Sequence, residues 1–189
     1  MEQYLNLGGV LHSASGAPLK GLVCSDYFFL CIGTELRRDD AAGLRFCDIL
    51  ESGGFPKERL VKCEFGLENC ASVVEEALVR KAVLVDAMIS LKGEDENVDY
   101  ILTDLKSVDD ERMFLVTTHS IPVKFVVEVL RSEGLLRDVL VLGIVARDLS
   151  LGEGLSERVQ EVVEGLARMV LDLWRECSEA GRDAESGSR

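Results

Sequence analysis

Short apolar runs alternate with helical patterns along most of this chain, and this alternation limits the possible fold more than any other feature. The runs have the length of strands, they are rich in β-branched and aromatic residues, and several are apolar on both faces. Strands are predicted at 27–32, 60–65, 82–85, 100–102, 113–116 and 139–146. Such strands belong to parallel sheets that helices cover on both sides. The pattern therefore predicts an α/β fold: a three-layer αβα sandwich around a mostly parallel, twisted sheet, in a single domain.

Helical patterns fill the intervals between these strands. Helices are predicted from about Asp40, over 73–78, after Pro122 and from Ser156 onwards. Pro122 suits the first turn of a helix, where its missing N–H costs nothing. Ser156 is a favourable N-cap residue. The crossovers between parallel strands should be right-handed.

The two ends of the chain lack this periodicity. Residues 1–22 contain several glycines and predict an irregular leader, 23–177 form the α/β domain, and the polar residues 178–189 predict a disordered tail. The first residues do not show a basic region followed by an apolar core. No apolar run approaches the ~18 residues of a membrane span. We therefore expect a cytoplasmic protein without membrane insertion.

The charge balance of the 189 residues narrows the choice of partners. There are 21 Lys and Arg against 34 Asp and Glu, which gives a formal net charge of −13. A field of this sign repels phosphate backbones, and no basic stripe opposes it locally. Nucleic acid is therefore not expected as a partner, whereas metal ions and basic peptide segments fit the charge better.

The six cysteines do not form a recognisable metal framework. No Cys-x-x-Cys occurs, and neither of the two histidines is placed to complete a zinc finger. We expect buried free thiols, because cysteine within a strand or helix behaves as a small apolar residue. A Cys63–Cys70 bridge remains an open alternative. The cysteines are Cys24, Cys31, Cys47, Cys63, Cys70 and Cys177.

Polar residues follow three of the predicted strands, where ligands bind in open α/β sheets. Asp39 and Asp40 come after the first strand, Asp86 ends the third, and His119 follows the strand at 113–116. Because parallel strands end at one edge of a sheet, these side chains are predicted to share a crevice. Carboxylates and an imidazole suit divalent nickel, zinc, iron or manganese, and three protein ligands leave the coordination open to substrate.

Each of these residues also has a simpler structural interpretation. Asp39 or Asp40 could cap the first helix, Asp86 could cap the loop after its strand, and His119 could donate to a nearby carbonyl. Other catalytic motifs are lacking in the sequence. It contains no G-x-S-x-G and no phosphate-binding glycine loop, so serine hydrolysis and nucleotide binding are disfavoured.

Four stretches together resemble the hydrogenase maturation endopeptidases, which trim the C-terminal extension from nickel-iron hydrogenase large subunits. The likeness is greatest to the formate-hydrogenlyase-type branch, and it covers most of the chain after the leader. The stretches are Ile32 to Gly43, Leu84 to Ala87, Thr117 to Pro122, and Val141 to Ile144 with the helix start Leu155-Ser156-Glu157.

The resemblance implies a function and a set of site residues. It implies an endopeptidase that cuts the large-subunit precursor after nickel insertion and uses the precursor's own nickel as the recognition mark. Asp40, Asp86 and His119 would contact that nickel, and Asp40 or Asp39 would act as the base toward water. The family is grouped with aspartic-type peptidases, although no Asp-Thr-Gly occurs here.

This chain departs from the family pattern in two places. Thr34 stands where the family usually has asparagine, and Met88 to Gly93 replace a common Pro-Gly turn. Two other functions stay open. One is a non-catalytic metal-binding assembly protein for the same precursor, and the other is a flavodoxin-like nucleotide binder, because this architecture hosts many functions.

Overall fold

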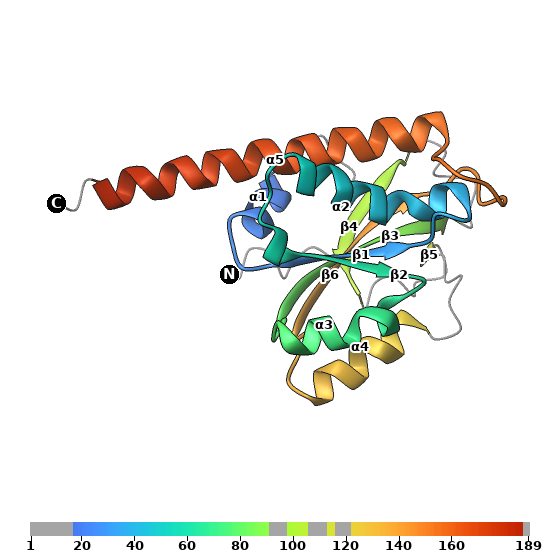
Figure 1. The fold of residues 1–189 in the computed structure, drawn as a ribbon, viewed down its shortest axis with the longest axis horizontal. Coiled ribbons are helices and arrows are strands. Elements are labelled where there is room, and N and C mark those ends of the chain that lie inside the picture. Colours follow the sequence, from blue (N-terminus) through green and yellow to red (C-terminus); the bar gives the residue numbers. More distant parts are fainter. Residues whose placement is uncertain (1–16, 91–97, 106–112, 116–121, 187–189) are drawn as a thin grey trace.

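The computed structural model describes residues 17–90, 98–105, 113–115 and 122–186, which contain six strands and five α-helices (Figure 1). Strands and helices alternate except that β3, β4 and β5 follow one another. The strands are β1 (Phe28–Gly33), β2 (Leu60–Glu64), β3 (Lys81–Ser90), β4 (Tyr100–Asp104), β5 (Met113–Leu115) and β6 (Asp138–Val145). The α-helices are α1 (Ala17–Val23), α2 (Ala42–Ser52), α3 (Ala71–Glu76), α4 (Val123–Ser132) and α5 (Glu157–Ser186). Short 3-10 turns are η1 (Arg38–Ala41), η2 (Lys57–Arg59) and η3 (Leu67–Cys70).

The strands form one mostly parallel sheet in the order β2-β1-β3-β6-β4. β1, β2, β3 and β6 pair in parallel, for example Leu30 with Leu84 and Leu84 with Val141. β4 runs antiparallel to β6, and β5 runs antiparallel to the end of β3. The strand at 113–116 had been expected to run with the parallel set, so its direction is a correction.

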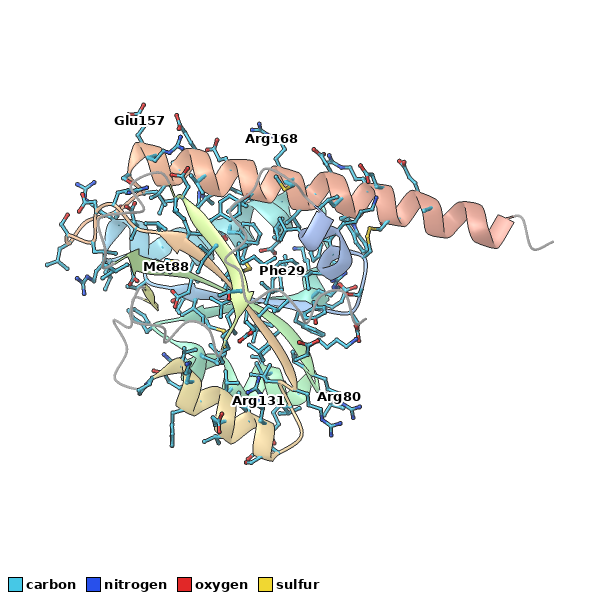
Figure 2. All side chains as sticks on the ribbon, turned by 180° about the vertical axis from the view of Figure 1, so that it is seen from behind. Phe29, Arg80, Met88, Arg131, Glu157 and Arg168 are labelled. Carbon is cyan, nitrogen blue, oxygen red and sulfur yellow. A yellow bond between two sulfur atoms is a disulfide. The ribbon has the colours of Figure 1, made fainter. Side chains whose placement is uncertain are left out.

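Helices cover both faces of the sheet, as Figure 1 shows, with α1, α2 and α5 on one side and α3 and α4 on the other. Because alternate side chains of a strand point to opposite faces of the sheet, the side chains of β1 are shared between two hydrophobic cores. Phe29 packs under α2 and α5, whereas Leu30 packs towards α3 and α4. Side chains fill the space on both sides (Figure 2). The predicted three-layer αβα sandwich is therefore confirmed.

The ends of the domain are more regular than predicted. Helix α1 lies largely within the expected irregular leader, and it buries Leu19, Leu22 and Val23 against the core at the i, i+3, i+4 spacing of an amphipathic helix. Helix α5 continues to Ser186, where a disordered tail had been expected. Its last turns contain alanine, glutamate and arginine, which favour helix, and a single glycine does not stop it. The rest of the predicted leader lies outside the described residues.

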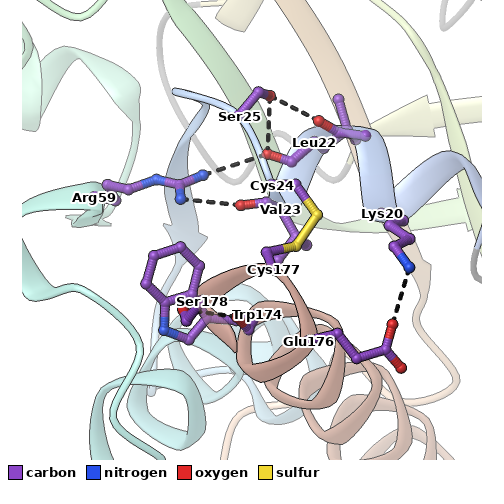
Figure 3. Close-up of a disulfide and its surroundings, with 11 residues drawn as sticks. Lys20, Leu22, Val23, Cys24, Ser25, Arg59, Trp174, Glu176, Cys177 and Ser178 are labelled. Atoms are coloured by element: carbon purple, nitrogen blue, oxygen red, sulfur yellow. Dashed lines mark hydrogen bonds and ion pairs between the residues drawn. A yellow bond between two sulfur atoms is a disulfide. The ribbon is translucent and has the colours of Figure 1, made fainter. Parts of the chain in front are cut away.

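The six cysteines form three disulfides, so the prediction of free thiols is wrong. Cys24 bonds to Cys177, Cys31 to Cys47, and Cys63 to Cys70. The first bridge ties the end of α1 to α5 (Figure 3). The second joins β1 to α2, and the third closes the turn after β2. Only the third was considered from the sequence, because the other two pair residues that the fold brings together.

No helix in the described part of the chain combines the length and the apolar composition that a membrane crossing requires.

Candidate functional site: a buried carboxylate pair

Two glycines let the chain fold tightly between the carboxyl end of β1 and the middle of β3. Gly33 ends β1 at φ 152°, and a Cβ there would overlap the carbonyl oxygen of Asp40. A Cβ on Gly43, in the first turn of α2, would overlap the backbone oxygens of Ile32 and Val85. The loop after β1 therefore returns against its own strand and lays the start of α2 on β1 and β3. This approach carries Asp40 to Asp86, the residue after Val85.

Asp40 and Asp86 form a buried carboxylate pair. Their exposed fractions are 0% and 1%. Burial, and then the nearby charge of Asp40, raise the pKa of Asp86 well above its ordinary value, and the backbone N–H of Ala87 opposes this only in part. The Asp86 Oδ1 atom has no hydrogen-bond partner within the described residues. A buried carboxylate in this condition either keeps its proton or takes up a cation.

Asp39, the neighbour of Asp40, has different surroundings. It is fully buried, and its carboxylate accepts hydrogen bonds from the backbone N–H groups of Arg147 (2.8 Å), Asp148 (2.7 Å) and Ser156 (2.6 Å). The Ser156 hydroxyl donates a fourth bond at 2.9 Å. These bonds fasten the loop after β1 to the loop that connects β6 with α5. Asp39 is thus a structural anchor, which does not fit its predicted role as an alternative base.

Several solved structures with this fold are named as hydrogenase maturation proteases or endopeptidases. The chain is similar to a [NiFe] hydrogenase maturation protease HycI from Thermococcus kodakarensis KOD1, with 22% identity, a TM-score of 0.65, and coverage of 84% of this chain and 99% of that one. It is similar to an endopeptidase HycI from Escherichia coli, with 20% identity, a TM-score of 0.58, and coverage of 75% and 86%. It is also similar to the hydrogenase maturating endopeptidase HybD from E. coli, with 18% identity, a TM-score of 0.56, and coverage of 79% and 92%.

This chain has the fold of the hydrogenase maturation proteases. The resemblance predicted from short motifs is therefore confirmed at the level of the fold. No protein-family model matches the sequence, and no curated protein is similar to it in sequence.

Asp86 occupies a different place on its strand from the one predicted. It was expected to end the third strand, but β3 of this maturation-protease fold continues to Ser90, and Asp86 pairs with Gly143 of β6. The strand is longer because β6 supports it as far as Met88 on one side while β5 pairs with it from Met88 onwards on the other. Asp86 is consequently held by the sheet backbone and not by a loop.

His119 lies outside the described residues, so its position relative to the carboxylate pair stays a prediction. The reasoning that placed it there was partly wrong, because β5 is antiparallel and does not end at the shared carboxyl edge. β5 nevertheless pairs Leu115 with Met88, two positions beyond Asp86. Within the described residues, no group of three His, Cys, Asp or Glu side chains could hold a metal ion.

The first departure from the family pattern has a structural role. Thr34 is 5% exposed, and its Oγ1 accepts a hydrogen bond from the backbone N–H of Leu36 at 3.3 Å. Threonine can form this turn in the way that asparagine does, through a side-chain oxygen that accepts from the backbone two residues on. The second departure begins with Met88, where β3 continues as a strand.

Sequence reasoning missed the residues that hold the loops around the pair. Arg38 lies beside Asp148 (Nε to Oδ2 3.3 Å), and Arg37 Nε donates to the carbonyl of Leu149 at 3.2 Å. These partners are more than a hundred residues apart in the chain, with a separation of 112 for the second. No local pattern in the sequence could have revealed them.

Proposed function

We propose that this chain is an endopeptidase that removes the C-terminal extension of a nickel-iron hydrogenase large-subunit precursor. The observation that carries the proposal is the buried Asp40–Asp86 pair at the carboxyl end of a maturation-protease sheet. The solved structures with this fold are named as hydrogenase maturation proteases and endopeptidases. A cytoplasmic location belongs to the same proposal.

The carboxylate pair favours a substrate that brings its own cation. Burial, and then the nearby charge of Asp40, raise the pKa of Asp86, so both acids cannot be charged at low cost. A divalent ion removes that cost, so docking of a nickel-loaded precursor would release the proton of the pair and stabilise the complex. Nickel is part of the substrate in this proposal, and Asp40, Asp86 and His119 are the residues assigned to contact it.

Hydrolysis would follow from this docking. The precursor's nickel polarises the scissile carbonyl or the attacking water. Asp40 takes a proton from that water, and the hydroxide adds to the carbonyl carbon. The C–N bond then breaks as protonated Asp40 returns its proton to the leaving nitrogen, and the extension is released. Asp39 is not assigned a part in these steps because its oxygens already accept four hydrogen bonds.

The test compares nickel-loaded with nickel-free large-subunit precursor, incubated with the wild-type protein, and follows the precursor's mass. Cleavage of the loaded form alone is expected. Equal cleavage of both forms would refute nickel as the recognition mark. An unchanged mass despite stable binding would instead favour the non-catalytic assembly protein, since the same acid pair could hold a nickel-bearing partner without cutting it.

A matched pair of variants assigns the activity to the site. Asp40→Asn keeps the size of the side chain and removes the base, so cleavage should fall by about a hundredfold or more. Asp26→Asn changes an exposed aspartate at the opposite end of the sheet and should leave cleavage unchanged. Full activity in the Asp40→Asn protein would rule out Asp40 as the base.

A further inference from the structure

Three large apolar side chains are exposed on loops beside Asp40. Leu36 is 60% exposed, Phe65 50% and Leu151 82%. Leu36 follows β1, Phe65 follows β2, and Leu151 lies in the loop between β6 and α5. All three therefore lie at the carboxyl edge of the sheet, on the side of the molecule where the carboxylate pair is found. We call these residues the loop patch.

Backbone hydrogen bonds hold Leu36 next to Leu151. Arg37 and Gly152 form a parallel β-bridge, in which Gly152 N–H donates to the Leu36 carbonyl at 3.0 Å and Arg38 N–H donates to the Gly152 carbonyl at 2.9 Å. In a parallel bridge, the residues that precede the two partners lie side by side on the same face. The Asp39 carboxylate fastens the same two loops a few residues further along.

Phe65 is fixed to the same edge from the other side. Its N–H donates to the Gly33 carbonyl at 2.9 Å, and Gly33 packs on the backbone of Asp40. Phe65 adopts φ 63°, and Arg38 in the neighbouring loop adopts φ 43°. Non-glycine residues hold this left-handed conformation only where the surrounding structure enforces it. Leu78 after α3 and Leu136 before β6 adopt it as well, so the conformation shows that the backbone is held and does not by itself mark a site. The loop patch is thus a rigid apolar surface that borders the carboxylate pair.

We propose that the loop patch binds an extended, apolar stretch of the substrate polypeptide next to the bond that is cut. This inference rests on the proposed function, because the occupant is the polypeptide that Asp40 would act on. A rigid apolar surface next to a reactive group fits a chain that has to be aligned before it is cut. Two exposed glutamates adjoin the patch in the chain, Glu35 before Leu36 and Glu153 two residues after Leu151, and polar residues commonly border apolar contact surfaces.

Four exposed apolar side chains on the α3 and α4 side of the sheet provide a matched comparison. Val73 and Leu78 lie on or next to α3, and Phe125 and Val129 lie on α4. These helices cover one face of the sheet, and none of the buried acids among the described residues belongs to them. The position of the loop patch beside Asp40 is what identifies its occupant as substrate.

The test uses the nickel-loaded large-subunit precursor of the same organism as its probe. Leu36→Ser/Leu151→Ser should raise both the KM for cleavage and the Kd for binding at least tenfold, with kcat within twofold of wild type. Phe125→Ser/Val129→Ser, which removes comparably exposed apolar side chains from α4, should change neither constant. Leu151→Phe keeps the apolar area and should bind as wild type does. Thermal unfolding of each variant verifies that the fold is intact.

The two proposals fail in different ways. If the wild type binds the precursor without cutting it, the proposed activity is refuted, and the Kd values still decide the role of the loop patch. Constants within twofold of wild type in the double serine variant would overturn the inference. A wild-type dimer that the double serine variant dissociates would also overturn it, because a second copy of the chain would then be the occupant.

Discussion

Titratable side chains lie at both ends of the sheet, but the two ends differ in how these side chains are hydrogen-bonded. At the amino end, Lys81 forms an ion pair with Asp26 at 2.8 Å, and the Tyr27 hydroxyl donates to Asp138. Arg59 donates to the carbonyl of Tyr27 at 2.9 Å and stacks over an aromatic ring. At this end each of these polar groups has a protein partner.

At the carboxyl end, two buried aspartates differ in their hydrogen bonding. Asp39 accepts four hydrogen bonds, whereas the Oδ1 atom of Asp86 has no hydrogen-bond partner in the part of the chain that the structure describes. A buried polar atom without a partner destabilises the fold. Polar groups with hydrogen-bond partners stabilise the fold. Asp86, which has an oxygen without such a partner in the described part of the chain, is therefore the acid to examine for function.

The strongest test of this difference between the two ends is the Asp86→Asn variant. We expect cleavage of the precursor to fall about 1,000-fold, because the variant cannot accept the substrate's cation as a carboxylate does. The free energy of unfolding at pH 7 should rise by about 1–3 kcal/mol, since a buried ionisable group becomes neutral. Precursor mass and urea unfolding measure the two effects. A variant that is fully active, or less stable than wild type, would show that Asp86 has a structural role, as the hydrogen-bonded polar groups do.

Gly43→Ala tests whether the carboxyl end depends on close backbone contact. The added Cβ would overlap the backbone oxygens of Ile32 and Val85, so we expect a loss of about 2–3 kcal/mol in the free energy of unfolding. Gly165→Ala is the matched control on α5. Its Cβ would meet nothing within 4 Å, and it should stabilise the helix by about 0.5–1 kcal/mol. Equal effects of the two substitutions would contradict the role assigned to Gly43.

The pH dependence of stability should differ in sign between the two ends. The pKa of Asp86 is higher in the folded protein than in the unfolded chain, where it is 3.8. The contribution of Asp86 to the free energy of unfolding is therefore fully present below pH 3.8 and is lost as the pH rises through the pKa of the folded state. Asp86→Asn should therefore gain stability over wild type as the pH increases from 4 to 7. The effect should amount to about 1–2 kcal/mol over that range.

Asp26→Asn provides the opposite case. Its hydrogen bond with Lys81 lowers the pKa of Asp26, so its contribution is present above the unfolded value and lost on acidification through the folded pKa. This variant should be less stable than wild type at pH 7 and equal to it near pH 2. Unfolding curves collected across this pH range give the difference in the free energy of unfolding between each variant and wild type. This difference should rise with pH for Asp86→Asn and fall with pH for Asp26→Asn. A change in the same direction for both variants would refute the comparison.

The smallest effect is expected for Tyr27→Phe. Burial, and then the hydrogen bond with Asp138, raise the pKa of Tyr27, so its hydroxyl stays protonated and donates throughout the physiological range. Removing the hydroxyl should cost about 1 kcal/mol and leave cleavage unchanged. Chemical unfolding and a cleavage assay measure the two, and a loss of activity would place function at the amino end.

The sequence predicted the positions of strands and helices better than it predicted which segments pair with one another. Most strands and helices appeared where periodicity placed them, because hydrophobic alternation is local. α4, for instance, begins right after Pro122. The antiparallel course of β4 and β5 and the full length of β3 depend on pairing between distant segments. The disulfides of Cys31 and Cys24 depend in the same way on a fold that a single sequence does not display.

The site shows the same division. Asp40 and Asp86 were predicted, and the structure brings them together through the close approach at Gly33 and Gly43. The anchoring role of Asp39 was not predicted, because its partners lie 108 to 117 residues away. His119 stays a prediction. Residue types and strand ends could therefore suggest the buried acid pair, but they could not separate the anchoring carboxylate of Asp39 from its neighbour Asp40.

The Cys24–Cys177 bridge also changes how the molecule would respond to traction. It joins residues 153 apart, and so it encloses nearly all of the domain in one covalent ring. Force applied to the two chain ends would pass through the sulfur atoms and bypass the sheet. An unfolding motor that engages either end would have to draw a closed loop of polypeptide through its pore, unless a reductant opens the bridge first.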